Sequence, residues 1–464
     1  MTLRRNLIIV VAHGLRSDTA GDTQHWPYVA PNIETLCNRG MRVAAVSACP
    51  ADVGGMVSLL TGMHARQHGY VQATDQQVSC EGFPHWLAAA GYHVAGVGCV
   101  GLFEGALHRQ ILVEPLGKLD PGRCAYAKAM REKGYYAAIR QQRQQRLRYG
   151  PFDPERLLLE PGDDVDGFIT AQARAMLADM PTDRPWALIV AYTGPGNDLP
   201  PPGLYDQLLD PYELGAGFSP ADFRSLDVLA ELDYPRILLQ RLEREQVGRI
   251  RADYLGRVSL IDHGVGRLMA HLGRRSDRGR TWFVVASDRG QLLGENGLVG
   301  HRSFLAGALE VPVIVSPPSV ARPGSPAREK IRNVDGLASS VDVAATIAEL
   351  GGCDMPASVA GRSLLKAFRE DKGHDDQTSS GAADQCISEF GRRLMLETHR
   401  HKIIFDTDTR KPIGLYDLRS DELENQNLVD TPAGWNLLDA MRWRLADSLM
   451  PLRTTPAMVG TQSP

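Results

Sequence analysis

The sequence predicts an α/β fold with a mostly parallel sheet and helices on both of its faces. Residues 7–11, 186–191 and 282–286 are continuous apolar runs, typical of strands buried on both faces. Long helical stretches at 166–180 and 241–272 lie between or beside these strands. Strands that alternate with helices favour this class of fold.

The other elements follow from the same patterns. A helix over 31–39 ends at Gly40 and a helix over 53–60 ends at Gly62, because glycine commonly follows a helix C-terminus. The remaining expected elements are strands at 41–47, 92–97, 394–397 and 402–405, and helices at 83–90, 131–148 and 435–448.

One polar segment divides the chain. Residues 371–385 contain few apolar side chains, which predicts a surface loop. We therefore expect a large α/β domain over 1–370 and a C-terminal subdomain over 386–464.

The composition excludes some classes of protein. The 464 residues carry a net charge of −4, which gives no reason to expect nucleic acid as a partner. No run approaches the roughly 20 apolar residues of a membrane span. The seven cysteines are odd in number and scattered, which argues against a disulfide framework. Residues 7–12 form an apolar run too short for a signal sequence, so we expect a cytoplasmic protein.

Residues 47–62 are the most informative segment. Pro50 and the run Ser58-Leu-Leu-Thr-Gly62 resemble the nucleophile segment of the type I sulfatases, a branch of the alkaline phosphatase superfamily. Further segments resemble that family in the same order along the chain, at 6–12, 30–40, 91–98, 287–300, 311–312, 341–347, 361–364, 401–402, 415–418 and 424–428. The resemblance implies an alkaline phosphatase-like α/β/α sandwich with a small antiparallel C-terminal subdomain.

The functional positions of the family are almost all replaced. Carried over one by one, its metal ligands, nucleophile and sulfate-binding residues fall on His13, Gly14, Asp52, Met56, Cys99, Gly101, Gly196, Asp288, Arg289 and His301. Only Asp288 keeps the residue type of the family. Asp52 stands at the position of the cysteine that becomes formylglycine, and Met56 at that of its arginine partner. The resemblance thus implies a sulfatase scaffold with a degenerate active site.

This loss has a chemical consequence. Hydrolysis of a sulfate or phosphate ester places extra negative charge on oxygen, which fixed cations and a metal ion offset. Calcium prefers 6–8 oxygen ligands. The carried-over positions offer Asp288 and Asp52, so we expect no bound calcium. Without the ion, Asp288 would be a buried carboxylate in need of a partner. We expect a guanidinium, from Arg289 or from elsewhere in the chain, to pair with Asp288, Asp52 or both.

Two questions about the site stay open, the role of Asp52 and the presence of a rebuilt metal site. Asp52 directly precedes a helix, which favours a helix-capping role over that of an aspartyl nucleophile. Transition metals favour histidine, cysteine and carboxylate ligands. A rebuilt site for such an ion is therefore an alternative. Its candidate ligands are His13, Asp52, Cys99, Asp288 and His301.

The sequence therefore predicts a catalytically silent sulfatase homologue that acts by binding a small anion or a protein partner. The alternative is a divergent sulfuric or phosphoric ester hydrolase with a rebuilt metal site. A third possibility is an oligomeric scaffold whose site is filled by side chains such as Met56. A homo-oligomer is compatible with each of these.

Overall fold

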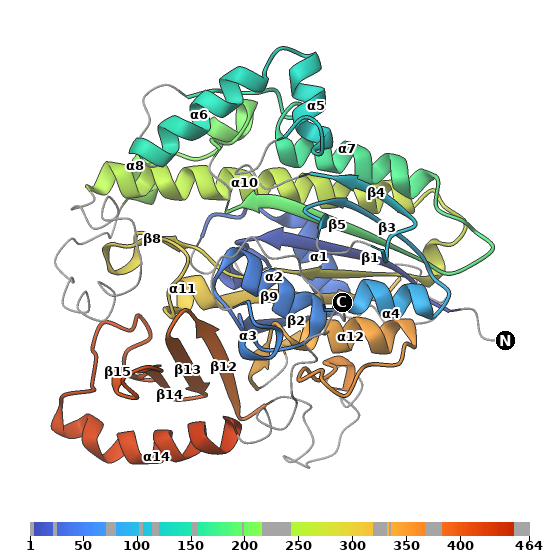
Figure 1. The fold of residues 1–464 in the computed structure, drawn as a ribbon. Coiled ribbons are helices and arrows are strands. Elements are labelled where there is room, and N and C mark those ends of the chain that lie inside the picture. Colours follow the sequence, from blue (N-terminus) through green and yellow to red (C-terminus); the bar gives the residue numbers. More distant parts are fainter. Residues whose placement is uncertain are drawn as a thin grey trace, which may run out of the picture.

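The computed structural model describes residues 4–21, 26–70, 80–101, 105–113, 120–149, 156–196, 199–215, 243–318, 332–333, 336–366 and 383–449. Within them a nine-stranded sheet has the order β10-β2-β9-β6-β1-β5-β3-β4, with β11 also paired to β2 (Figure 1). Its strands are β1 (Asn6–His13), β2 (Met41–Val46), β3 (His93–Gly98), β4 (Arg109–Leu112), β5 (Trp186–Pro195), β6 (Thr281–Ala286), β9 (Glu310–Ser316), β10 (Arg332–Asn333) and β11 (Ala338–Ser339).

The sheet is mostly parallel, as predicted. β1 lies at its centre and pairs in parallel with both β5 and β6, so that Val10 is opposite Val190 and Val285. β9 is the exception, because it runs antiparallel to β2 and to β6. The apolar side chains of β1 are fully buried, which explains why this strand reads as an uninterrupted apolar run.

Helices cover both faces of the sheet, which confirms the α/β/α sandwich. Alternate side chains of β1 point to opposite faces, so Ile8 and Val10 belong to one apolar cluster, and Leu7 and Ile9 to the other. The first cluster includes residues of α1 (Pro31–Arg39), α5 (Ala125–Glu132), α6 (Tyr136–Tyr149), α7 (Val165–Ala178) and α10 (Arg244–Leu272). The second includes residues of α2 (Asp52–Thr61), α4 (Phe83–Ala89) and α12 (Asp342–Gly351).

A smaller antiparallel sheet forms the C-terminal subdomain, again as predicted. Its strands are β12 (Gln385–Phe390), β13 (Arg393–Thr398), β14 (His401–Asp406) and β15 (Pro412–Asp417), in that order. One face packs against α14 (Pro432–Leu449), which lies along the outer side of this sheet (Figure 1). The other face contacts Val46, Phe304 and Leu309 of the large domain.

The remaining short elements connect these layers. They are η1 (Ser17–Thr19), α3 (Ala65–His68), η5 (Gly203–Gln207), α8 (Pro211–Leu214), η8 (Arg278–Arg280), β7 (Leu292–Leu293), η9 (Glu295–Gly297), β8 (Val299–Gly300) and α11 (Ala306–Leu309). No helix in the described ranges is both long and apolar enough to cross a membrane.

Three local predictions need correction. The helix expected over 131–148 is two helices, α5 and α6, because Gly134 adopts a φ of 83° and interrupts the chain. Asp52 is the first residue of α2, and Ala51 occupies the capping position in an extended conformation. The last part of the expected loop 371–385 is structured, since Ala383 pairs with Leu337 and β12 begins at Gln385. Residues 371–382 of that loop lie outside the described ranges.

Candidate functional site

The candidate site lies at the carboxyl edge of four parallel strands. His13 ends β1, Cys99 follows β3, Gly196 follows β5, and Asp288 follows β6. The carboxyl edge is where open α/β sheets generally bind their ligands. Five of the residues predicted from the sequence, these four and Arg289, thus come together although they are far apart in the chain.

Asp288 is the centre of this site. Its carboxylate is fully buried and accepts a hydrogen bond of 3.3 Å from the backbone N–H of Gly14. Its other oxygen lies 2.9 Å from Nδ1 of His13 and 3.9 Å from Nε of Arg289. A buried carboxylate is stable only when it is paired and hydrogen-bonded. His13 supplies the close ion pair, and Arg289 adds a second positive charge at longer range.

The charge of His13 depends on Asp288. Burial opposes protonation of the imidazole, but the neighbouring carboxylate outweighs it and raises the pKa of His13 from 6.5 to about 10. The neighbouring Cys99 side chain acts in the same direction. His13 therefore carries a positive charge at neutral pH.

This pair makes stability depend on pH. Because the folded-state pKa is raised, the stabilisation is complete below 6.5 and is lost as the pH rises toward about 10. We expect the free energy of unfolding of the wild type to exceed that of His13→Asn at neutral pH, with the difference shrinking toward pH 10. Chemical denaturation of both proteins across this range checks the prediction. Parallel pH profiles would contradict it.

Arg289 is inside the site and not in solvent. Its side chain is buried, and Nη1 lies 3.4 Å from Oε1 of Gln291, which accepts its hydrogen bond. Two glycines make room for the guanidinium: a Cβ atom at Gly14 would lie 2.8 Å from Nη1, and one at Gly196 would lie 2.9 Å from it. The backbone N–H of Gly196 also donates to the His13 carbonyl at 2.9 Å.

The other predicted positions differ in where the structure places them. Met56 is buried in the apolar cluster under α2, where it acts as a core residue. Gly101 is exposed. The side chain of Asp52 lies outside the described part of the structure, although its backbone begins α2. His301 is partly buried next to Arg302, whose N–H donates to the Pro50 carbonyl at 2.9 Å just before α2.

The groups around Asp288 do not suit calcium. The neighbours described above are an imidazole, a guanidinium and a backbone N–H, all of which present nitrogen or a positive charge. Calcium takes oxygen ligands. Among the described residues, no group of three or more histidine, cysteine, aspartate or glutamate side chains is arranged to hold a metal ion.

A buried polar network fixes the segment beside the site. Arg257 of α10 is 1% exposed and pairs with Asp164 at 2.9 Å and Asp166 at 3.2 Å. It also donates to the carbonyls of Leu199 at 2.7 Å and Pro200 at 2.9 Å. Because Asp166 in turn accepts from the N–H of Thr193 at 2.8 Å, the chain is held on both sides of Gly196.

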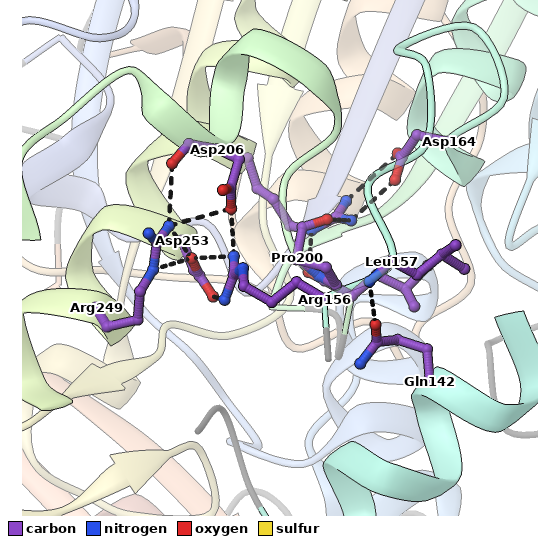
Figure 2. A network of polar contacts seen from close by, with 10 residues as sticks. Gln142, Arg156, Leu157, Asp164, Pro200, Asp206, Arg249 and Asp253 are labelled. Carbon is purple, nitrogen blue, oxygen red and sulfur yellow. Dashed lines mark hydrogen bonds and ion pairs between the residues drawn. The ribbon is translucent and has the colours of Figure 1, made fainter. Parts of the chain in front are cut away.

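The same network continues away from the site. Figure 2 shows Arg156 between Asp206 and Asp253, with Arg249 on the other side of these carboxylates. Nε of Arg249 lies 2.7 Å from Asp253, and its Nη2 donates to the Asp206 carbonyl at 3.1 Å. The two arginines and two aspartates therefore attach the segment around 156 and the η5 turn to α10.

Sequence reasoning missed Gln291, the Gly14 N–H and the Arg257 network. Asp164 and Asp166, just before and within the first turn of α7, were a usable signal, since Asp164 caps that helix. Nothing in the local sequence indicated that Arg257 would reach them from α10.

Comparison with known protein families agrees with this architecture. The family model described as Sulfatase matches residues 5–353, and that described as N-sulphoglucosamine sulphohydrolase, C-terminal, matches residues 294–450. The choline-sulfatase of Rhizobium meliloti is 25% identical over 460 residues, covering 93% of this chain and 84% of that protein.

Two further likenesses concern other activities. The multifunctional alkaline phosphatase superfamily protein PehA of Trinickia caryophylli is 26% identical over 246 residues, covering 48% of this chain and 46% of that protein. This chain thus spans about half of the length of PehA. The phosphonate monoester hydrolase of Agrobacterium radiobacter has the same fold, with a TM-score of 0.77, 17% identity, and coverage of 97% of this chain and 95% of its own.

The first family model covers most of the described chain, including the strands that carry the candidate site. The central sheet, the helix that begins at Asp52 and the C-terminal antiparallel sheet occur in the order along the chain that the sequence predicts. The chain therefore belongs to the sulfatase family.

Proposed function

We propose that this protein is a catalytically silent member of the sulfatase family that acts by binding a small anionic ligand. The observation that carries this proposal is the pairing of Asp288. The one carboxylate retained from the family's metal-binding set is in close contact with His13 and has Arg289 beside it.

The position of Arg289 supports the same proposal. Its guanidinium lies against Gly14 and Gly196, two positions at which the resemblance places functional side chains of the family and this chain has glycine. Both replacements remove a side chain that would collide with the guanidinium. A set of changes that fits together in this way is what we expect if a fixed cation has replaced a bound one.

The charge of the site supports an anionic ligand. His13 and Arg289 are two cationic side chains at the strand ends, and groups of this kind suit an anionic ligand. The same cations are too few to replace the metal and the several fixed donors that sulfate ester hydrolysis requires.

An assay of turnover tests the proposal. We expect no hydrolysis of 4-nitrophenyl sulfate, 4-nitrophenyl phosphate or a phenylphosphonate ester above the uncatalysed rate, with or without added calcium, zinc or manganese. An active arylsulfatase assayed in parallel shows that the conditions suffice.

The alternative, a divergent ester hydrolase with a rebuilt metal site, predicts the opposite result. Turnover that requires an added metal and disappears in Asp288→Asn would establish that alternative. It would also overturn the proposal that the protein is catalytically silent. Turnover that persists in Asp288→Asn would indicate a contaminating hydrolase, because Asp288 is the centre of the site.

A further inference from the structure

Helix α14 presents two exposed tryptophans on its outer side. The chain has six tryptophans, all within the described ranges, and only Trp435 and Trp443 are largely exposed, at 61% and 78%. The opposite side of the helix, with Met441 and Leu445, packs in the apolar cluster of the C-terminal sheet. Large apolar side chains that gather on one exposed face generally mark an interaction surface.

A row of exposed residues along α14 has the spacing of a helix–helix contact. Its members are Trp435, Asp439, Arg442 and Ala446. Intervals of four, three and four residues align them along one stripe of a helix, as in the seam of a coiled coil. Trp443 is the neighbour of Arg442 in the chain and widens the apolar part of this stripe.

The two charges in the stripe are available to a partner. Nη1 of Arg442 lies 3.7 Å from Asp439, one turn earlier, and the two side chains are 49% and 84% exposed. An exposed ion pair of this kind adds little to the stability of the chain. Both charges can therefore be shared with a second molecule at little cost.

We propose that α14 is the interface of a homodimer, in which it packs antiparallel against α14 of a second copy of this chain. The stripe is self-complementary about a two-fold axis between positions 440 and 441. Asp439 then faces the partner's Arg442, and Trp435 faces the partner's Ala446. Opposite charges meet, and a large side chain packs against a small one. A parallel pair would instead place each charge opposite its own copy.

The tryptophans supply the area that such a dimer needs. A tryptophan buries about 150–250 Å², so four of them would provide about a third of the roughly 1,600 Å² of a typical specific interface. Tryptophan and arginine also contribute most to binding energy at interfaces. No described segment covers this face, and α14 lies along the outer side of the C-terminal subdomain (Figure 1). The inference goes beyond the proposed function, because it does not involve the ligand site.

Sedimentation velocity of the full-length protein over a range of concentrations tests the proposal. We expect the wild type to form a dimer. Asp439→Arg and Arg442→Asp should each raise the dissociation constant at least about tenfold, because each places like charges at both symmetry-related contacts. Arg109→Asp reverses an exposed charge on β4 of the large domain and should leave the dissociation constant unchanged.

A mixture of the two charge variants is the most specific test. In a mixed dimer, the stripe of one chain carries two positive charges and that of the other carries two negative charges, so both contacts join opposite charges. We expect the equimolar mixture of Asp439→Arg and Arg442→Asp to dimerise at least about tenfold more tightly than either variant alone. Recovery in the mixture also shows that both variants are folded.

Several outcomes would overturn the proposal. A wild type that is monomeric at every concentration would do so, and a shift of its tryptophan emission on phosphatidylglycerol vesicles would then identify a lipid surface as the occupant of this face. A dimer that both charge variants leave unchanged would have its contacts elsewhere. A mixture no tighter than the separate variants would exclude the antiparallel pairing. Failure of ester turnover or of anion binding bears on none of these results, so this inference and the proposed function are tested separately.

Discussion

Replacing Arg257 with methionine is expected to lower the free energy of unfolding by about 3–5 kcal/mol. The substitution keeps an unbranched side chain of similar reach but removes the charge. Asp164 and Asp166, both at most 1% exposed, would lose their buried cation. The carbonyls of Leu199 and Pro200 would lose their hydrogen-bond donors as well. Urea denaturation of the variant and the wild type measures the effect.

Arg109→Met is the matched control for that experiment. Arg109 pairs with Asp179 at 2.7 Å, but the two side chains are 45% and 63% exposed. An exposed pair contributes about 0–1 kcal/mol, so the control should be close to the wild type. If Arg257→Met were no less stable than Arg109→Met, the buried network would not fix the segment around Gly196 as we infer.

Replacing Lys402 with methionine is expected to destabilise the C-terminal subdomain to a similar extent, about 3–5 kcal/mol at neutral pH. Nζ of Lys402 is buried, lies 3.1 Å from Glu397, and forms an ion pair with Glu424. It also donates to the Phe304 carbonyl at 3.0 Å. The variant would leave two carboxylates inside the interface between the two domains.

The pH dependence distinguishes this mechanism from a loss of packing. Burial already raises the pKa of Glu424, and removing Lys402 raises it further, so the variant should recover stability as the solution is acidified. Arg392→Met, which removes an ion pair whose partners are 64% and 56% exposed, is the control in the same subdomain. A loss of stability in Lys402→Met that is the same at neutral and acidic pH would contradict the charge mechanism.

Much of the fold could be predicted because the signals are local. β1, β5 and β6 are apolar runs buried on both faces, and α1 and α2 end at Gly40 and Gly62 as predicted. The errors arose where one residue decides the outcome. Gly134 divides a segment whose polar pattern predicts one continuous helix. The helix α2 begins at Asp52, one residue earlier than expected if Asp52 were its cap.

For the site, the sequence predicted which residues come together but not how they pair. The resemblance was sufficient to place His13, Cys99, Gly196, Asp288 and Arg289 together, because strand ends of a parallel sheet meet at one edge. The pairing within the site was not. Arg289 was expected to be the main partner of Asp288, whereas His13 lies closer, at 2.9 Å against 3.9 Å. Such a choice depends on side-chain directions that no sequence pattern encodes.

Elemental analysis of the untagged protein, purified without chelator, tests most directly whether cationic side chains have replaced the metal. We predict no stoichiometric metal, because His13 and Arg289 already neutralise Asp288. A full equivalent of zinc, manganese or iron in each chain would contradict this and point to a rebuilt hydrolase site. A full equivalent of calcium would show that the residues around Asp288 have been assigned wrongly.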